Sequence, residues 1–507
     1  MKTRDLLGAA AAIFCAACAA ACVGTIVDHH DPALGDDDTM PGTPDSAVPM
    51  GTPDANLPII DGAIIPPTPD ATPEQTHDVQ PRLIAGGGVA DAPIGGELNV
   101  HVIDARTGAP LSGASVRVGD AAASTPLTGT TDGSGLAVLT SGGLAGKQTV
   151  TASASGHAAA TWIGVGGANV TVALAPTAAP PTATVTGNIN GWDSLPAPPS
   201  FNDYNLAIVL YTFLDDLNAA ENSIPQPTAN GTPTNTCLRT AISNSCAWKM
   251  TARVGQQLHY AVIVRGNTRG TTNNQADDTY TLLGYAVGAA TTLTPGQNLS
   301  NETLTMISAG AMTGLQVSFA SAPSGLSDVV AIPMIDLGAR GRVMLPLPSV
   351  TPASTSLNIP GGGAFAGGTT EVVSMATPPG APSTPFSLAF ARDVGGTSAS
   401  PGAFPAPPAG LSAGGGSYAF SPMAGASLHV ATLTATGGAT LYWSVVILDG
   451  TTSFNLPTLA QDPLPSGSLE LHVTGTQVGS FAATDFAMPT VTANFTRAGG
   501  DSVTFAH

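Results

Sequence analysis

The stretch Leu98–Val118, LNVHVIDARTGAPLSGASVRV, decides the fold of this chain. Val100 and Val102 alternate with polar residues, which puts them on one face of a strand because successive side chains of a strand point to opposite faces. A turn signal rich in Gly and Pro follows, and the alternation resumes at Val116 and Val118. Short alternating strands joined by turn residues are typical of an antiparallel β-sandwich.

A longer motif runs through the same stretch. Its residues stand in the order D-x-x-T-G-x-P-L-x-G-A-x-V-x-V and then T-D-x-x-G, and they are Asp104, Thr107, Gly108, Pro110, Leu111, Gly113, Ala114, Val116, Val118, Asp132, Gly133 and Gly135. This order resembles the carboxypeptidase regulatory-like family of transthyretin-like (prealbumin-like) β-sandwiches. His157, after Gly156, stands where that family has tyrosine. The resemblance covers residues 94–176 and implies a spacer, a folding aid or a binding platform rather than one activity.

Composition favours strands along the whole chain. Its 507 residues include 60 Gly and 43 Pro, and in a helix interior each Gly costs about 1 kcal/mol and each Pro about 3 kcal/mol. Hydrophobic residues make up 43%, which is enough apolar surface for buried cores. We therefore predict an all-β chain of tandem antiparallel β-sandwich domains, preceded by a signal peptide and a disordered acidic, Pro-rich tether.

Two further β-rich domains are predicted. Residues 182–308 form a second β-sandwich, because Leu206–Tyr211 is a continuous apolar run of the kind found in buried strands. Residues 309–507 form a C-terminal β-rich domain with strong strand patterns near its end, such as Thr440–Leu448. The Gly-, Pro- and Ser-rich residues 351–418 are expected to form a long loop or weak strands.

Residues 1–22 are typical of a bacterial export signal. Lys2 and Arg4 precede an apolar run too short and too Ala-rich for a comfortable membrane span. Three alanines stand directly before Cys22, which resembles a lipobox, where the cysteine receives diacylglycerol. Cys18 is the alternative acylated residue, and ordinary secretion is the alternative to lipidation. The layout is similar to that of myxobacterial lipoproteins, which implies membrane attachment in the cell envelope, at the outer membrane or cell surface.

Residues 23–85 are predicted to be the tether. They contain no Lys or Arg before Arg82, and they repeat a Thr-Pro-Asp unit that begins at Thr43, Thr52 and Thr68. Proline fixes φ and like charges repel, so this segment should be extended and unpacked. At ~3 Å per residue it could hold folded modules on the order of 100 Å from an anchor.

Cys237 and Cys246 are the two cysteines that follow residue 22. In an exported chain, a close pair of this kind predicts a disulfide. The short loop that it closes should add roughly 2–3 kcal/mol to stability in the chain-entropy description.

Ligand-binding residues are harder to assign, and the candidates are aromatic. Trp192, Trp248 and Tyr204 could line a sugar-binding platform, because flat aromatic faces stack on pyranose rings. Aromatic residues of a β-sandwich more often belong to the core. Exposed, coplanar tryptophans would favour the platform, and buried ones would count against it.

No catalytic or metal-binding residue is predicted. Gly410–Gly414 spells G-x-S-x-G, but the Pro-rich segment before it and the glycines after it do not allow the strand and helix of a nucleophile elbow. Asp215-Asp216 and Asp277-Asp278 are adjacent carboxylates, which point opposite ways on a strand. His29-His30 lacks a closed ligand set.

The remaining histidines are also expected to be structural. The chain has no H-E-x-x-H or similar zinc spacing. His101 and His157 are expected at the surface or in turns, and His429 and His472 on an outer sheet face. The sequence therefore predicts neither a metal nor a cofactor.

The charge balance limits the partners. The formal net charge is −19, from 34 acidic and 15 basic residues, so a cationic face for nucleic acid is not expected. The function predicted is that of a non-enzymatic lipoprotein displaying β-sandwich modules for structural or binding roles, with a glycan or an envelope protein as partner. The alternatives are a carbohydrate-binding or adhesion protein and, less favoured, a secreted hydrolase with its site within residues 309–507.

Overall fold

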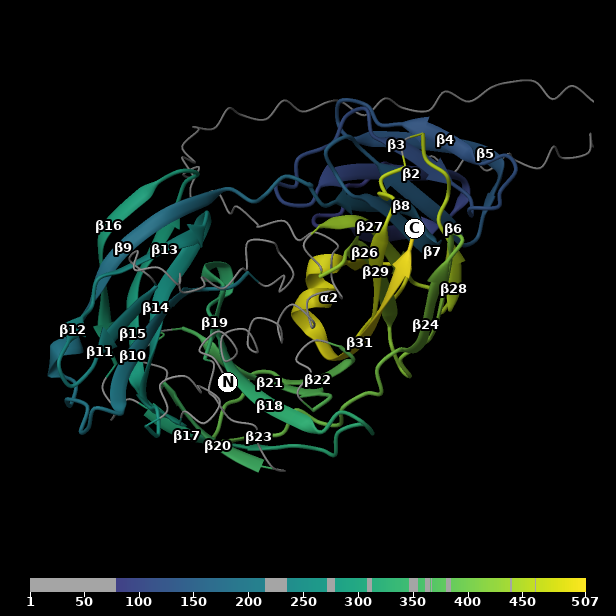
Figure 1. Cartoon of the computed structure of the whole chain (residues 1–507). Helices are drawn as coiled ribbons and strands as arrows, with labels where there is room; N and C mark the ends of the chain where they lie inside the picture. The colour runs from purple at the N-terminus through teal and green to yellow at the C-terminus, as the bar shows by residue number, and fades with distance from the viewer. Residues whose placement is uncertain are drawn as a thin grey trace, which may run out of the picture. The chain divides into compact units, whose positions relative to one another are not determined.

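The computed structural model describes residues 79–214, 235–270, 279–307, 312–345, 354–360, 365, 367–379, 384–437, 440–460 and 462–507. Strands dominate these residues (Figure 1). Among them the helical elements are α2 (Met488–Asn494) and two 3-10 turns, η1 (Trp192–Ser194) and η4 (Gly338–Arg340). The prediction of an all-β fold with several sheets is confirmed. The signal peptide and the tether up to residue 78 lie outside the described residues.

The first sandwich packs a five-stranded sheet against the last four strands of a twelve-stranded sheet. In spatial order the smaller sheet contains β30 (Phe486–Ala487), β1 (Gly88–Pro93), β8 (Gly167–Leu174), β2 (Gly95–Asp104) and β5 (Leu136–Ala145). The four strands of the larger sheet are β7 (Ala159–Val165), β6 (Gln148–Ser153), β3 (Ser115–Val118) and β4 (Leu127–Thr130). Strands β2 and β8 pair in parallel, whereas most neighbours are antiparallel.

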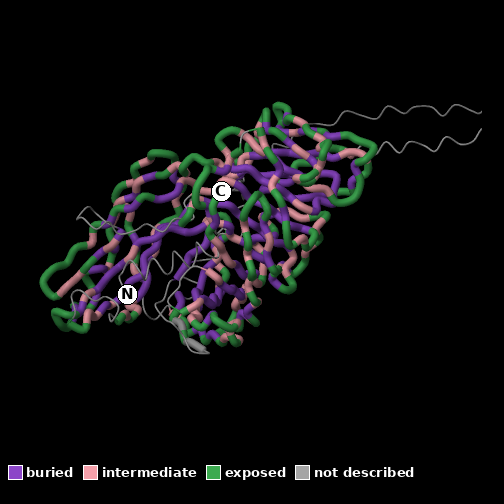
Figure 2. Tube along the Cα trace, turned by 45° about the vertical axis from the view of Figure 1, so that its right-hand side comes forward, coloured by how far each residue is buried: buried purple, intermediate pink, exposed green. Residues whose placement is uncertain are grey.

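The alternating valines of the opening stretch form the centre of this sandwich. Val100, Val102 and Val116 are fully buried, together with Trp162 of β7. Figure 2 shows the same pattern along the strands, with buried positions inside and exposed ones concentrated in the connections. The alternation of apolar residues at every second position, which predicts the strand, is therefore also the alternation of side chains that point into the core.

The twelve-stranded sheet continues beyond β7 into the C-terminal part of the chain. Its other strands, listed from the far edge, are β19 (Arg342–Met344), β18 (Asp328–Asp336), β21 (Thr369–Thr377), β22 (Phe386–Ala391), β31 (Phe495–Ala506), β29 (Ser468–Val478), β26 (Leu428–Ala435) and β27 (Leu441–Ile447). Strand β27 pairs in parallel with β7, from Trp443 opposite Ala159 to Ile447 opposite Ile163. One continuous sheet thus joins segments that are far apart in the sequence.

The second sandwich is built from one eight-stranded sheet. In spatial order its strands are β12 (Asn244–Ser245), β11 (Thr236–Arg239), β10 (Asp203–Tyr211), β14 (Gly255–Asn267), β15 (Thr279–Leu293), β16 (Asn298–Met306), β9 (Thr182–Asn190) and β13 (Trp248–Arg253). The edge strand β13 also lies against β10 and β11, so the sheet folds over its own core. The apolar run Leu206–Tyr211 forms most of β10, as predicted.

Two three-stranded sheets complete the described residues. One contains β20 (Ser354–Pro360), β17 (Met312–Ser318) and β23 (Ser398–Ala399). The other contains β24 (Ala409–Gly414), β25 (Ser417–Ser421) and β28 (Ser453–Asn455).

The expectation of a long loop or weak strands over residues 351–418 is wrong for its middle part. Strands β21 and β22 are buried, and they lie inside the twelve-stranded sheet. Val372 and Val373 occupy opposite faces of β21, and both are buried because the sheet is covered on both sides there. Glu371 is also buried, between Arg342 and Arg392, and a charged residue beside a short apolar run obscures the strand pattern.

The hydrophobic clusters contain residues from more than one of the predicted domains, 94–176, 182–308 and 309–507. One cluster combines Tyr260 and Tyr285 of the second sandwich with Val372 and Phe386. Another combines Trp162 with residues of β26, β27 and α2. Packing is therefore continuous across the described residues, although the sequence changes composition at the linkers.

The first described residues, Val79–Ile84, are attached to the first sandwich by side-chain hydrogen bonds. The amides of Asn99 and Asn169 donate to the carbonyls of Val79 and Gln80 at 2.9 and 3.1 Å. The Arg82 N–H donates to Asn169 Oδ1 at 2.9 Å, and the Ile84 N–H donates to Thr171 Oγ1 at 2.8 Å. Asn99 and Asn169 lie opposite each other on the parallel strands β2 and β8 and are fully buried. We call Val79–Ile84 the strap.

The buried contact between β7 and β27 yields a stability prediction. The indole N–H of Trp443 donates to Thr161 Oγ1 at 3.0 Å, and Thr161 also bonds to Thr151 at 2.9 Å. Replacing Thr161→Val leaves the indole donor buried without an acceptor, so the free energy of unfolding should fall by about 1–3 kcal/mol in urea titrations. Thr128→Val, at an exposed position of β4, is the matched control and should leave stability almost unchanged. Equal stabilities for the two variants would contradict this account.

Candidate functional site

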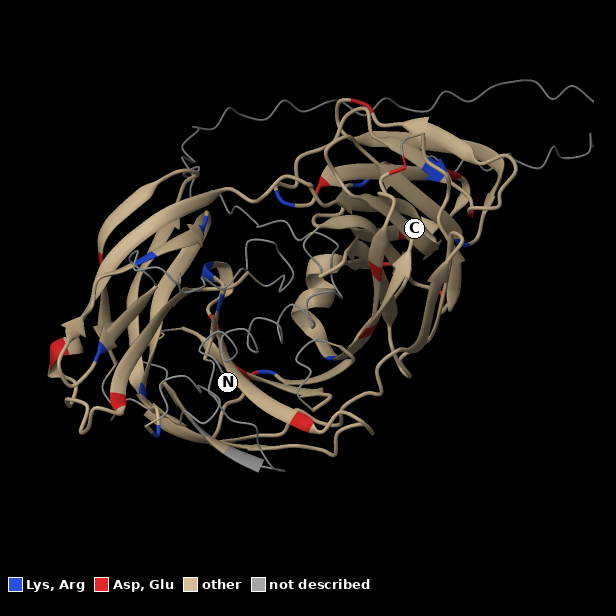
Figure 3. Ribbon diagram, viewed as in Figure 1, with Lys and Arg blue, Asp and Glu red and all other residues tan. Residues whose placement is uncertain are grey.

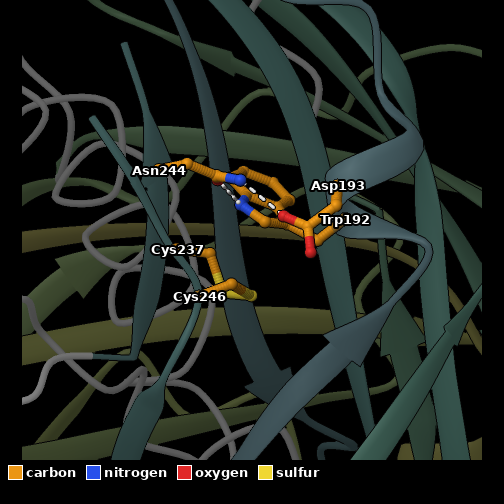
Figure 4. Close-up of a disulfide and its surroundings, with 5 residues drawn as sticks. All are labelled: Trp192, Asp193, Cys237, Asn244 and Cys246. Atoms are coloured by element: carbon orange, nitrogen blue, oxygen red, sulfur yellow. Dashed lines mark hydrogen bonds between the residues drawn. A yellow bond between two sulfur atoms is a disulfide. The ribbon is translucent and has the colours of Figure 1, made fainter. Parts of the chain in front are cut away.

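A disulfide closes the hairpin of β11 and β12 at one end of the second sandwich. Cys237 and Cys246 are bonded, with Cα atoms 4.3 Å apart, so the predicted disulfide is confirmed (Figure 4). Leu238 pairs with Ser245, and Arg239 pairs with Asn244, within the loop that the bond closes. The covalent bond and the backbone pairing hold the hairpin in one shape.

Hydrogen bonds attach this hairpin to η1. The indole N–H of Trp192 donates to Asn244 Oδ1 at 2.7 Å, and the Asn244 amide donates to the carboxylate of Asp193 (Figure 4). The Arg239 guanidinium donates to the carbonyls of Asp193 and Leu195 at 3.1 and 2.7 Å. Arg239 and Asn244 therefore both bond to the segment that follows β9.

A second arginine fixes the next part of the same connection. The Arg265 guanidinium donates to Pro196 O at 2.8 Å and to Asn205 Oδ1 at 3.0 Å. The Asn205 amide donates to Pro196 O at 3.0 Å. Ser200 Oγ donates to Asp203 at 2.6 Å where β10 begins. The loop 195–202 is held against its sheet at several points.

Large apolar side chains project from these fixed loops. Phe201 is 83% exposed, Ile242 is 84% exposed and Leu238 is 44% exposed. Ile242 lies at the turn between β11 and β12, and Phe201 lies just before β10, whose pairing with β11 brings Asn205 opposite Arg239. The three residues therefore share one end of the sheet, and we call them the apolar tip. Phe201 and Ile242 stand in short connections rich in Ser, Asn and Ala, whereas Leu238 lies within β11.

The aromatic residues predicted as a sugar platform occupy different surroundings. Trp192 and Trp248 are 2% and 1% exposed and belong to the core, so they present no stacking face. Trp248 packs against Gly187, where a Cβ would lie 2.6 Å from the ring. Tyr204 is half-buried, with its hydroxyl 3.1 Å from that of Tyr280 and its ring over Gly266. Burial of the two tryptophans counts against a sugar platform, whereas Tyr204 is half-buried.

The histidines also differ from the expectation of surface positions. His101 and His429 are buried, and burial lowers the pKa of both, with Asp132 opposing the shift at His101. His429 Nε2 accepts the Met423 N–H at 3.1 Å. His472 lies partly buried beside Glu470, 3.4 Å away, and burial lowers its pKa more strongly than Glu470 raises it. These rings are core and packing groups.

His157 and Asp104 join the two ends of the family-like motif. His157 Nε2 lies 2.9 Å from Asp104 Oδ2, while Asp104 Oδ1 accepts the N–H groups of Arg106 and Thr107 at 2.9 and 2.7 Å. Burial raises the pKa of Asp104, but the bonds from His157, Thr107 and Arg106 outweigh it, so the pKa is lowered overall. The pair stabilises the turn at Gly108, where φ is +70°.

The remaining sequence candidates show no reactive arrangement. Ser412 lies in β24, which pairs with β25, so the G-x-S-x-G segment is a strand and not a strand–turn–helix elbow. Asp215-Asp216, Asp277-Asp278, His29-His30, Cys18 and Cys22 lie outside the described residues. Within the described ranges, no group of three or more His, Cys, Asp or Glu side chains is placed to hold a metal ion.

Charged residues are few and dispersed over the described strands (Figure 3). Glu371 is the most enclosed carboxylate of the twelve-stranded sheet, 2.7 Å from Arg392 and 3.4 Å from Arg342. The Arg392 guanidinium also lies over the rings of Phe390 and Phe495. Among the described residues, no helix has both the length and the apolar character needed to cross a bilayer.

Comparison with known proteins gives likeness only among solved structures. No protein-family profile and no curated protein sequence matches the chain. The Bacillus anthracis TIE protein is 12% identical with a TM-score of 0.14, over 57% of this chain and 46% of that one. The full-length major pilin SpaD from Corynebacterium diphtheriae is 12% identical with a TM-score of 0.14, over 56% of this chain and 88% of that one. The major pilin subunit BcpA of Bacillus cereus is 8% identical with a TM-score of 0.15, over 60% and 97%.

The chain therefore spans less than half the length of the TIE protein. Identities and TM-scores as low as these carry no argument about function. The family resemblance of residues 94–176 remains a prediction from the sequence, and the functional reading depends on this chain's own residues.

Removing the disulfide should destabilise the hairpin end measurably. In the double variant Cys237→Ala, Cys246→Ala the unfolded chain regains the freedom of the closed loop, and the free energy of unfolding should fall by roughly 2–3 kcal/mol. Urea unfolding of the variant should match that of the unaltered protein in reductant, which serves as the control. An unchanged unfolding midpoint in both cases would contradict the prediction.

His429 makes stability depend on pH. Burial lowers its pKa to about 4, below the value of about 6.5 in an unfolded chain. Because the folded pKa is the lower one, the contribution is complete above about pH 6.5 and is lost as the pH falls towards 4, to a total of about 3 kcal/mol. Urea unfolding at several pH values should show this slope, and His429→Leu should remove that part of it. An equal slope in the variant would show that other groups are responsible.

Proposed function

We propose that this chain is an exported, non-enzymatic envelope lipoprotein that displays β-sandwich modules for structural or binding work outside the cytoplasm. The observation that carries the proposal is the disulfide between Cys237 and Cys246. Its hairpin is largely exposed to solvent, and such bonds persist in oxidising compartments, whereas cytoplasmic thiols are kept reduced. The export signal of residues 1–22 gives independent support from the sequence.

The anchor proposed is diacylglycerol on Cys22, with Cys18 as the alternative. The alanines before Cys22 provide the small residues that lipoprotein processing needs. An anchor at this position would be followed by the acidic Thr-Pro-Asp segment, whose composition favours an extended chain. The outer membrane or the cell surface is the location proposed.

The first sandwich is proposed to be a member of the carboxypeptidase regulatory-like family. The motif residues shape the turns of this sandwich. Asp104 accepts the N–H groups of the turn, and Gly108 and Gly113 adopt φ of +70° and +76°. Gly135 has φ of +74°, and a Cβ there would lie 2.7 Å from Val102 O. A motif that specifies turns supports a shared fold and is silent on activity.

Structural use of the reactive side chains supports a non-enzymatic role. Asp104 and His157 bond to each other across a turn, and His429 is an acceptor for a backbone N–H. Glu371 is neutralised between Arg342 and Arg392. Groups engaged in this way are held by packing and paired charges, and they do not converge on a common point as acid–base partners must.

Acylation tests the proposal directly. Cells of a bacterial host that express the full chain should incorporate labelled palmitate into the protein, and Cys22→Ala should abolish the label. Cys18→Ala is the matched control and should retain the label if Cys22 is the acylated residue. The opposite pattern would move the anchor to Cys18. Absence of label in the unaltered chain, together with release of the protein into the medium, would contradict lipidation and leave secretion.

A further inference from the structure

Strand β5 forms one edge of the five-stranded sheet (Figure 1). It pairs with β2 on one side, and in the described part of the chain no strand pairs with its other side. The strand is ten residues long and contains neither a charged residue nor a proline. Natural β-sheets protect exposed edges with charges, prolines or very short strands, because an unprotected edge pairs readily with another strand. The edge of β5 lacks these forms of protection.

Several other edges of the described sheets differ from β5 in this respect. Strands β12 and β30 contain two residues each, and β13 carries Lys249 and Arg253. Strands β4, β24 and β28 are also uncharged, but none of their large apolar side chains is exposed. Strand β5 combines the absence of charge with an exposed apolar side chain, that of Val138.

Val138 lies in the middle of the regularly paired part of this edge, Leu136–Thr140. Its side chain is 50% exposed, whereas its neighbours Ala137 and Leu139, on the core face, are each 4% exposed. A β-branched side chain on a sheet is stabilised by the side chains of the strands on both sides of it. Val138 has such a neighbour only on the side of β2.

The backbone groups of Val138 and Thr140 point away from the sheet. The Val102 N–H donates to Gly135 O at 2.8 Å, and bonded and non-bonded pairs alternate along an antiparallel ladder. Ala137 therefore bonds to β2, whereas Val138 and Thr140 direct their N–H and C=O groups outward. These are the groups that an added strand would bind.

We infer that β5 pairs with β5 of a second copy of this chain, in an antiparallel arrangement around a two-fold axis at Leu139. In this register Val138 lies opposite Thr140 of the second copy, and Thr140 lies opposite its Val138. Each outward N–H and C=O group of the two residues then gains a partner. The two exposed valines are each covered by a cross-strand threonine. A two-fold contact of this kind needs only one patch that fits itself.

The choice of a second copy as the partner follows from charge. The chain has a net charge of −19, so two copies repel each other over most of their surface, but β5 brings no charge to the contact. On β2, Glu97 lies opposite Thr140. Three strand spacings of about 4.8 Å would separate Glu97 from its copy, which exceeds the Debye length of about 8 Å at physiological ionic strength. The Asp132 carboxylate already accepts N–H groups of its own turn.

The oligomeric state in solution tests the inference. The mature chain, residues 23–507, is exported with a general secretion signal and studied by sedimentation velocity at several concentrations. A dimer whose fraction increases with protein concentration is expected. Because this chain carries no acylated cysteine, the measurement does not depend on the proposed lipid anchor. Absence of the palmitate label in cells would contradict that anchor and leave the dimer unaffected.

Two lysine variants identify the edge. Val138→Lys places like charges on neighbouring positions of the paired strands and removes the valine, so the dissociation constant of the dimer should rise about tenfold or more. Thr251→Lys, at an exposed position of β13, changes the net charge equally and is the matched control. It should leave the dissociation constant almost unchanged. Circular dichroism and the unfolding midpoint establish that both variants are folded.

Disulfide trapping tests the register. Cys237 and Cys246 are bonded to each other, so a cysteine introduced into residues 23–507 is the one free thiol. Residues that face each other in a bonded antiparallel pair have Cα atoms about 5.5 Å apart, within the range of a disulfide. A mixture of the Val138→Cys and Thr140→Cys variants should therefore give more covalent dimer on oxidation than either variant alone.

Three results would overturn the inference. The first is a monomer at every concentration, which is also the result expected if β5 binds a strand of a different protein. The second is an equal change of the dissociation constant in the two lysine variants. The third is a yield of covalent dimer from the mixed cysteine variants that does not exceed the yield from each variant alone.

Discussion

The parallel hydrogen bonding between β7 and β27 is the constraint on which the rest of the fold depends. Strand β7 belongs to the first sandwich and β27 to the C-terminal region, and their pairing makes one twelve-stranded sheet out of both. Parallel strands cannot be joined by a tight turn, so a long connection must separate them. Here the connection contains the entire second sandwich and both strands β21 and β22. The second sandwich thus lies within the connection between two neighbouring strands of one sheet.

The unusual composition follows from how this chain fills its cores. Aromatic residues make up only 5% of the sequence, and glycine supplies 60 positions. Several of the few large rings lie directly over glycines, such as Tyr204 over Gly266 and Phe386 over Gly500. A Cβ at Gly266 would lie 2.2 Å from the Tyr204 ring, so the glycine is a packing requirement there. A glycine on one strand leaves room for an aromatic ring on the neighbouring strand, and the ring fills the space that a larger residue would occupy.

The sequence predicted the sandwiches where strand patterns were regular and turns were marked. Val100 and Val102, the apolar run of β10 and the disulfide of Cys237 and Cys246 were all recognisable from local chemistry. The prediction from sequence was wrong where the burial of a residue depends on contacts with distant segments of the chain. Strand β21 is buried on both faces, so it lacks the alternation of a half-exposed strand, and the burial of Glu371 depends on two arginines distant in sequence.

Candidate surface residues were predicted less well for a similar reason. Tryptophan is as useful in a core as on a binding face, and only the pairing of β9 with β13 decides that Trp248 is enclosed. Exposure of Phe201 and Ile242 follows from their place in short connections at the end of a sheet. These connections can be located only when the ends of the strands are known, and the ends of the strands are set by long-range pairing.

The strap has a mechanical consequence. Tension applied through the N-terminal segment reaches the sandwich at Val79–Ile84 before it reaches β1. There it is shared among the amides of Asn99 and Asn169 and the hydroxyl of Thr171, all of them buried on neighbouring strands. A segment pulled from its N-terminal end must release these bonds in turn, beginning at Val79, before β1 is loaded. The end of the chain that would be pulled is therefore attached to the core by several side-chain hydrogen bonds.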